Sequence, residues 1–170
     1  MGLRLFNYTT VSPCTDSREE PELLTFVFRA FYAGGDLRGD TFRYKKVFLQ
    51  NLPVTKPDQP SAAIVEGLVN YVQFSNAHEQ KLQSAYFEQL IDALVYELYF
   101  PDEMRAAGKD VLRHLGKLTP ISDDQTDEEK LAIIQREFDR LYDPRHPVRN
   151  IIETVDSVEV VRTIREALKR

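Results

Sequence analysis

The sequence predicts a mainly α-helical fold, in which a helical body follows a smaller irregular or strand-containing segment; an α+β fold is the alternative. Two observations lead to this prediction. From residue 61 onward, apolar residues recur with helical spacing in four successive stretches. Residues 1–56 instead contain clusters of β-branched and aromatic residues, several glycines and one short helical pattern. We therefore expect two regions, residues 1–56 and residues 57–170.

The first region contains one predicted helix, between Glu20 and Tyr32. Pro21 suits its first turn, and the glycines at 34 and 35 suit its end. Its apolar residues share one face: Leu23, Leu24, Val27, Phe28 and Phe31. Residues 42–47 alternate aromatic and basic side chains, which is typical of a strand. Three prolines between residues 53 and 60 then predict a short extended linker.

The second region opens with a helix that Ser61 can cap. Residues 84–99 carry the longest apolar stripe of the chain and predict its most regular helix. Pro101 is expected to end that helix, and Asp102 can cap the next one. This next helix is predicted to continue as far as Gly116.

Two more helices are predicted towards the C-terminus. Thr126 and Glu129 have the spacing of a capping box, in which each side chain bonds to the backbone of the other residue. The stripe that follows is formed by Leu131, Ile134, Phe138 and Leu141. Two prolines in residues 143–147 break this helix, and a last helix is expected from about Asp156.

The composition excludes several classes of protein. The 22 basic and 27 acidic residues give a net charge of −5, so a polyanion could bind only at a local basic patch. A single cysteine, Cys14, excludes a disulfide framework and a thiolate metal cage. Charges interrupt every apolar run well before the roughly 18 residues of a membrane span, so no membrane partner is expected. The first 11 residues do not resemble a secretory signal, and a cytoplasmic location is expected.

Signatures of catalysis are missing from the sequence. The three histidines, His78, His114 and His146, lie more than 30 residues apart, so no metal site is expected. The chain has no glycine-rich cofactor turn and no amide-Pro-Pro-aromatic segment that could hold a flipped base. We therefore expect no cofactor and no catalytic activity in this chain.

One nuclease-like pattern remains. Two sets of acidic residues and a lysine resemble those of small Mg²⁺-dependent nucleases: Asp102 with Glu128 and Lys130, and Asp58 with Glu79 and Lys81. Such a site needs its residues on adjacent strands, whereas Glu128 belongs to the predicted capping box and Glu79 lies between helices. A small nuclease is therefore the least favoured hypothesis.

Two groups of cations are candidate DNA contacts. The first group lies in and after the glycine-rich loop: Arg38, Arg43, Lys45 and Lys46. Basic residues in such a loop can reach phosphates while the interleaved aromatic residues stack on bases. A half-buried strand shows the same alternation, so a structural role stays open. The second group lies on the last helix, where cations also complement the helix dipole: Arg162, Arg165 and Lys169.

Several stretches together resemble a known family. Residues 34–54, with Arg43-Tyr-Lys-Lys46 and the exit Leu52-Pro-Val54, resemble the end of the target-recognition region of type IIG restriction and modification enzymes and related adenine-specific DNA methyltransferases. Residues 87–101, 143–149 and 158–165 resemble the C-terminal tail of the same proteins. The order of these motifs is preserved, and the resemblance covers residues 23–54 and 84–168.

The resemblance implies that the chain is the carboxyl-terminal piece of such an enzyme. The family's catalytic core, which binds S-adenosylmethionine and flips adenine, lies upstream of this region, and no stretch here matches it. S-adenosylmethionine is therefore expected only in an upstream core. Residues 1–56 would be a remnant of the target-recognition region, in which Arg38, Arg43, Lys45 and Lys46 match the segment presented to DNA. The helical residues 57–170 would pack against the recognition region or the core.

Three functions are thus considered. The first is a non-catalytic DNA-recognition or scaffolding fragment of a restriction-modification DNA methyltransferase, with weak, salt-dependent binding to DNA and an upstream methyltransferase core or subunit as partner. The second is an all-helical protein-interaction module, in which the stripe of residues 86–99 or an exposed Tyr96 binds a partner. The third is the small nuclease.

Overall fold

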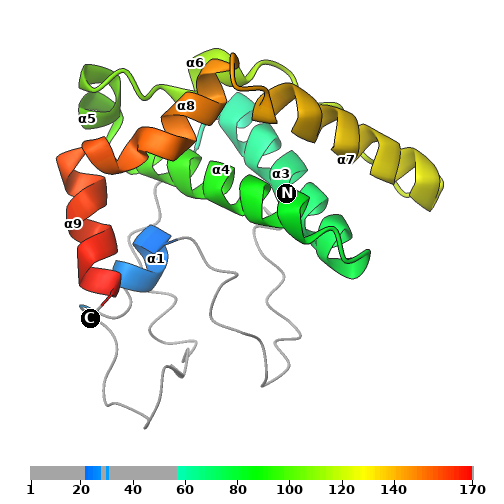
Figure 1. Cartoon of the computed structure of the whole chain (residues 1–170), viewed down its shortest axis with the longest axis horizontal. Coiled ribbons are helices and arrows are strands. Elements are labelled where there is room, and N and C mark those ends of the chain that lie inside the picture. The colour runs from blue at the N-terminus through cyan, green and yellow to red at the C-terminus, as the bar shows by residue number, and fades with distance from the viewer. Residues whose placement is uncertain (1–21, 28–29, 31–56, 170) are drawn as a thin grey trace, which may run out of the picture.

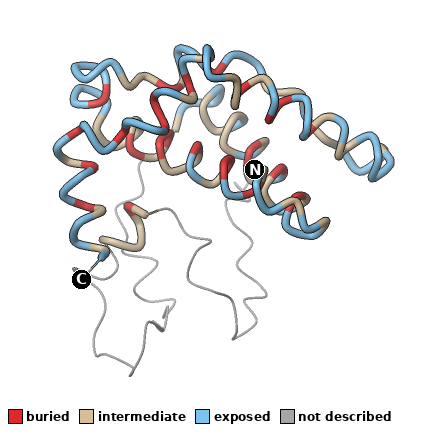
Figure 2. Tube along the Cα trace, in the orientation of Figure 1, coloured by how far each residue is buried: buried red, intermediate tan, exposed pale blue. Residues whose placement is uncertain are grey.

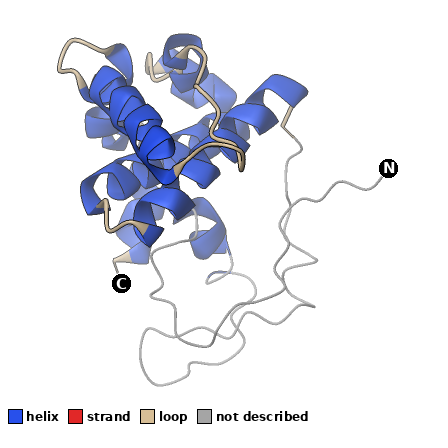
Figure 3. Cartoon of the chain, turned by 90° about the vertical axis from the view of Figure 1, so that its right-hand side faces the viewer, coloured by secondary structure: helices blue, strands red, loops and turns tan. Residues whose placement is uncertain are grey.

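The computed structural model describes residues 22–27, 30 and 57–169. Every regular element within these residues is a helix, which confirms the predicted mainly α-helical fold (Figures 1 and 3). The strand predicted at residues 42–47 lies outside the described residues. Among the described helices, none combines the length and the apolar character needed to cross a membrane.

Helices α3 (Gln59–Ala77) and α4 (Lys81–Tyr99) form a helical hairpin. Helix α3 begins earlier than predicted, because Asp58 rather than Ser61 is its N-cap. The Asp58 carboxylate accepts a hydrogen bond of 3.0 Å from the backbone N–H of Ser61. The predicted linker to Pro60 was therefore too long, since a proline fits the first turn of a helix, where no backbone donor is needed.

Helix α4 is the central helix of the body. The predicted stripe is buried at Tyr86, Phe87, Leu90 and Leu94, in a core shared with α3, α6, α7 and α8. Helix α4 is also buried at Tyr96, in a second core near its C-terminal end. Figure 2 shows buried residues distributed along the helix.

The single helix predicted from Asp102 to Gly116 is wrong. The structure has two short helices, α5 (Pro101–Ala106) and α6 (Val111–Leu115). Gly108 separates them with a φ of +66°, a conformation that favours glycine and cannot continue a right-handed helix. Pro101 opens α5 as well as ending α4, so Asp102 lies inside α5 and is not its cap.

Helix α7 (Asp127–Tyr142) begins with the predicted capping box. The Glu129 backbone N–H donates to the Thr126 hydroxyl oxygen at 3.2 Å, and the Thr126 backbone N–H donates to the Glu129 carboxylate at 2.8 Å. The predicted stripe is buried at Ile134, Phe138 and Leu141. The predicted break follows directly, since α7 ends at Tyr142.

We expect the variant Thr126→Ala to lose about 1 kcal/mol of unfolding free energy, because the Glu129 amide loses its acceptor. Urea denaturation followed by circular dichroism measures this loss. Thr163→Ala is the matched control, because Thr163 is an exposed threonine inside a helix whose hydroxyl only donates to the preceding turn at Glu159. A loss of equal size in both variants would contradict a specific role of the cap.

The C-terminal part contains α8 (Pro147–Thr154), the 3₁₀ turn η2 (Val155–Ser157) and α9 (Glu159–Leu168). Helix α8 was not predicted, and the last helix begins three residues later than predicted. The second core joins α9 and η2 to α1 (Glu22–Val27), α4 and α5. Its buried residues are Leu23, Tyr96, Met104, Val155, Val158, Val161 and Ile164.

Candidate nucleic-acid interface

The first group of predicted DNA contacts cannot be placed on the fold. Arg38, Arg43, Lys45 and Lys46 lie outside the described residues. The structure does describe the chain on either side of them. Helix α1 is described as far as Val27 and packs against α9 and α4, and apart from residue 30 the described chain resumes at Pro57, just before α3. The described elements that flank residues 28–56 therefore belong to one helical body (Figure 1).

The three cations of the second predicted group lie on helix α9 or at its C-cap, and they differ in exposure. Arg162 and Lys169 are exposed to solvent. Arg165 has a side chain only 22% exposed and is committed to two carboxylates. Its Nε donates to Glu22 at 2.7 Å, and its Nη1 donates to Asp156 at 2.6 Å. The three cations thus do not form one free basic surface, because Arg165 is held by carboxylates within the body.

Four elements meet around Glu22, the first residue of α1. Its carboxylate accepts a hydrogen bond of 3.0 Å from the Tyr96 hydroxyl of α4, besides the bond from Arg165. Its backbone N–H donates to the Asp92 carboxylate of α4 at 2.9 Å. Asp156 in η2 completes the set through Arg165. We call Glu22, Asp92, Tyr96, Asp156 and Arg165 the α1 clamp.

Burial and the neighbouring charges both shift pKa values in the α1 clamp. Removal of water raises the pKa of Asp92 to about 7, and the negative charge of Glu22 acts in the same direction. The N–H of Glu22 and the charge of Arg165 oppose this shift without cancelling it. For Arg165, burial disfavours the charge, but hydrogen bonds and charges from Glu22 and Asp156 outweigh it and raise the pKa of the guanidinium.

The charges of the chain are unevenly divided. Residues 28–56 contain six basic and two acidic residues, a net charge of +4. Residues 57–170 contain 14 basic and 21 acidic residues, a net charge of −7. A phosphate backbone is repelled by an acidic surface and attracted by a local basic one. The sequence between α1 and α3 is therefore the electrostatically favoured place for contact with a polyanion.

The acidic and lysine sets do not come together. Asp58 caps the start of α3, whereas Glu79 and Lys81 follow its end, and 19 helical residues span about 28 Å. Asp102 lies on α5 and Glu128 on α7, and Figure 1 shows these parts at opposite sides of the body. The residues described by the structure include no group of three or more His, Cys, Asp or Glu side chains placed to hold a metal ion.

The expectation of an exposed Tyr96 is wrong. Its side chain is fully buried in the second core, and its hydroxyl is bonded to Glu22. The stripe of residues 86–99 is also largely covered by neighbouring helices. Helix α4 therefore uses the buried residues of the stripe for folding, and the other stripe residues are half-buried.

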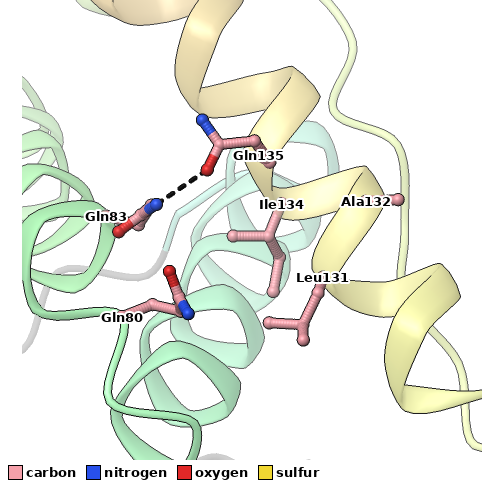
Figure 4. Close-up of a pocket in the computed structure, with 6 residues that line it drawn as sticks. All are labelled: Gln80, Gln83, Leu131, Ala132, Ile134 and Gln135. Carbon is pink, nitrogen blue, oxygen red and sulfur yellow. Dashed lines mark hydrogen bonds between the residues drawn. The ribbon is translucent and has the colours of Figure 1, made fainter.

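A cavity of about 310 Å³ lies where the start of α4 faces α7 (Figure 4). Three glutamines and three apolar residues line it: Gln80, Gln83, Leu131, Ala132, Ile134 and Gln135. The Gln83 amide donates to the Gln135 side chain at 2.7 Å across the cavity, as Figure 4 shows. These lining residues include neither a charged group nor a nucleophile.

A second polar network was missed by the sequence analysis. Glu137 of α7 is 5% exposed and accepts hydrogen bonds from Thr119 and Arg140. Burial opposes its ionisation, but these donors outweigh it and lower the pKa of the carboxyl. Arg140 also donates to the Leu115 carbonyl, and the Tyr71 hydroxyl donates to the Thr119 carbonyl. This network fixes the chain between α6 and α7, so its role is structural.

Comparison with known proteins returned no similarity. A scan against protein-family models, a search of curated proteins and a search of solved structures each found no match. The resemblance to restriction-modification enzymes therefore rests on the sequence motifs alone.

Proposed function

We propose that this chain is a non-catalytic DNA-recognition or scaffolding fragment of a restriction-modification DNA methyltransferase. The observation that carries the proposal is the contrast in charge: an acidic helical body flanks a segment of net charge +4 on both sides. Residues 28–56 also contain the motifs that resemble the end of a target-recognition region. In this proposal the segment contacts DNA and the body is its scaffold.

The electrostatics define what kind of binding is possible. Each phosphate neutralised by a lysine or arginine releases counterions, which makes the affinity fall steeply with salt. With a net charge of −7 on residues 57–170, the body opposes binding except where a cation contacts a phosphate directly. The proposed binding is therefore weak, local and strongly dependent on salt.

The partner in this proposal is an upstream methyltransferase core or subunit. The sequence has no glycine-rich cofactor turn. S-adenosylmethionine and the base-flipping chemistry would thus belong to that core. The helical body would supply rigidity, because α1 and α3 on either side of residues 28–56 are fixed to the same central helix.

We expect the triple variant Arg43→Ala, Lys45→Ala, Lys46→Ala to flatten the salt dependence of duplex DNA binding. Each lost phosphate contact removes about 0.9 from the slope of log affinity against log salt, so the slope changes by roughly 2 to 3. Fluorescence anisotropy of a labelled duplex over a range of salt concentrations measures it. The unfolding free energy should change by less than about 0.5 kcal/mol per substitution, the usual range for surface substitutions.

A matched triple variant removes the same charge elsewhere. Lys81, Arg113 and Lys117 are exposed cations on the helical body, and replacing all three with alanine gives the chain the same net charge. This control should leave the slope unchanged. Equal slopes in the wild type and the first variant would show that the contact lies elsewhere and would overturn the assignment to residues 28–56.

A further inference from the structure

The α1 clamp contains Arg165, a cation that the sequence predicted to contact DNA. In the structure, two carboxylates of the helical body bind it instead. Arg165 donates to Glu22 at 2.7 Å and to Asp156 at 2.6 Å, so its guanidinium joins α9, α1 and η2. Arg162, one helical turn away on α9, is exposed. The two carboxylates together outweigh the single positive charge of the guanidinium, so Arg165 attracts a phosphate less strongly than the exposed Arg162 does.

Helix α1 depends on these contacts for its conformation. The part of α1 that the structure describes has six residues, whereas an isolated helix in water is marginal below about 12 to 15 residues. Leu23 is its fully buried apolar residue, at 4% exposed, with Phe26 and Val27 partly buried in the same core. The clamp adds hydrogen bonds to both the backbone N–H and the carboxylate of Glu22. These contacts determine where α1 sits on α4 and α9.

We propose that Arg165 is a positioning residue: together with Tyr96 it anchors Glu22, and so fixes the point on the helical body from which the DNA-contacting segment departs. This inference rests on the proposed function, because residues 28–56 follow α1 directly. Arg165 would act on DNA binding through α1, whereas Arg162 and Lys169 remain free to contact phosphates.

The test compares Arg165→Gln with Arg162→Gln, which removes the same charge from an exposed position of the same helix. Hydrogen exchange of peptides covering residues 22–27 reports how firmly α1 is held. Arg165→Gln should lose protection there by about tenfold or more, while α3 and α7 stay protected. Arg162→Gln should leave α1 unchanged.

Duplex DNA binding supplies the second measurement. Arg165→Gln should lower affinity by about tenfold at every salt concentration with an unchanged slope, because no phosphate contact is removed. A slope reduced by about 0.9 together with unchanged α1 protection would make Arg165 a phosphate contact and overturn the proposal. Unchanged protection and unchanged affinity would overturn it as well.

Tyr96→Phe provides an independent variant if Arg165→Gln fails to fold. It keeps the buried ring and removes only the hydroxyl that donates to Glu22, and it should also lower the protection of residues 22–27. If the wild-type chain binds no duplex DNA, the proposed function fails, yet the exchange experiment still decides whether Arg165 and Tyr96 hold α1. A wild type that binds DNA while both variants retain α1 protection would refute the clamp alone.

Discussion

Replacing Phe87 with alanine is expected to reduce the unfolding free energy by about 3 to 5 kcal/mol, the range seen when a buried aromatic residue is truncated. The Phe87 side chain is fully buried at the centre of the larger core. Its ring centroid lies 5.3 Å from that of Tyr71, 6.1 Å from that of Tyr86 and 6.4 Å from that of Phe138. The variant therefore leaves a cavity where α3, α4 and α7 meet.

Such a loss is a large part of the roughly 5 to 15 kcal/mol that usually separates folded from unfolded states. Urea denaturation followed by far-ultraviolet circular dichroism measures it, since the chain has no tryptophan. Leu82→Ala is the control on the same helix, because Leu82 is 59% exposed. We expect this control to change stability by less than about 0.5 kcal/mol. Similar losses in both variants would contradict the assignment of Phe87 to the core.

The sequence predicted the helices whose signals are local. Helix α7 combines a capping box at Thr126 with a single apolar stripe, and both features are present in the structure. Helix α4 was predicted from its stripe, but the burial of Tyr96 on another side was not. A central helix is covered by several neighbours, and its pattern does not reveal which of its sides remains exposed.

Other elements depended on backbone details or distant partners. The division at Gly108 depends on its positive φ, which spacing does not encode. Helix α8 carried a usable signal that was overlooked: Pro147 in its first turn, followed by Val148, Ile151 and Ile152 at helical spacing. The cap of α6 is supplied by Glu97 of another helix, with hydrogen bonds of 2.8 and 3.0 Å to the N–H groups of Val111 and Leu112. No local sequence pattern predicts a cap that comes from another helix.

The candidate site illustrates the same limit. Sequence analysis grouped Arg162, Arg165 and Lys169 by charge and helical spacing. Only the structure shows that Arg165 donates a hydrogen bond to Glu22, which lies 143 residues away in the chain. This ion pair separates Arg165 from the exposed cations of the group. Charge patterns identify which side chains could contact DNA, whereas long-range ion pairs decide which of them are free.

The pH dependence of stability is expected to reveal the state of Asp92. The pKa of its carboxyl is raised from 3.8 to about 7, chiefly because the folded chain removes water from it. Glu22 of α1 and Glu88 of α4 add negative charge around it, while Arg165 of α9 acts in the opposite direction. In the unfolded chain the carboxyl is solvated and ionises near pH 4.

The folded chain therefore binds more protons at Asp92 than the unfolded chain between about pH 4 and pH 7. The contribution of Asp92 to the free energy of unfolding is therefore largest below pH 4, where the carboxyl is protonated in both states. This contribution is lost as the pH rises through 7, because the carboxyl must then ionise within the folded chain. The loss amounts to at most about 4 kcal/mol, and it is limited by the free energy of docking α1, because release of α1 lets water reach the carboxylate.

Asp92→Asn isolates this contribution. The side-chain oxygen of asparagine can still accept the hydrogen bond from the Glu22 backbone N–H, but the group no longer titrates. Urea denaturation at several pH values should show the wild type losing stability relative to the variant from pH 4 to pH 7, with a constant difference above about pH 8. Parallel profiles would show that Asp92 does not titrate in this range. A wild type that gains relative stability over the same interval would mean that the carboxylate is favoured in the folded chain, as expected if the N–H of Glu22 and the charge of Arg165 outweighed burial.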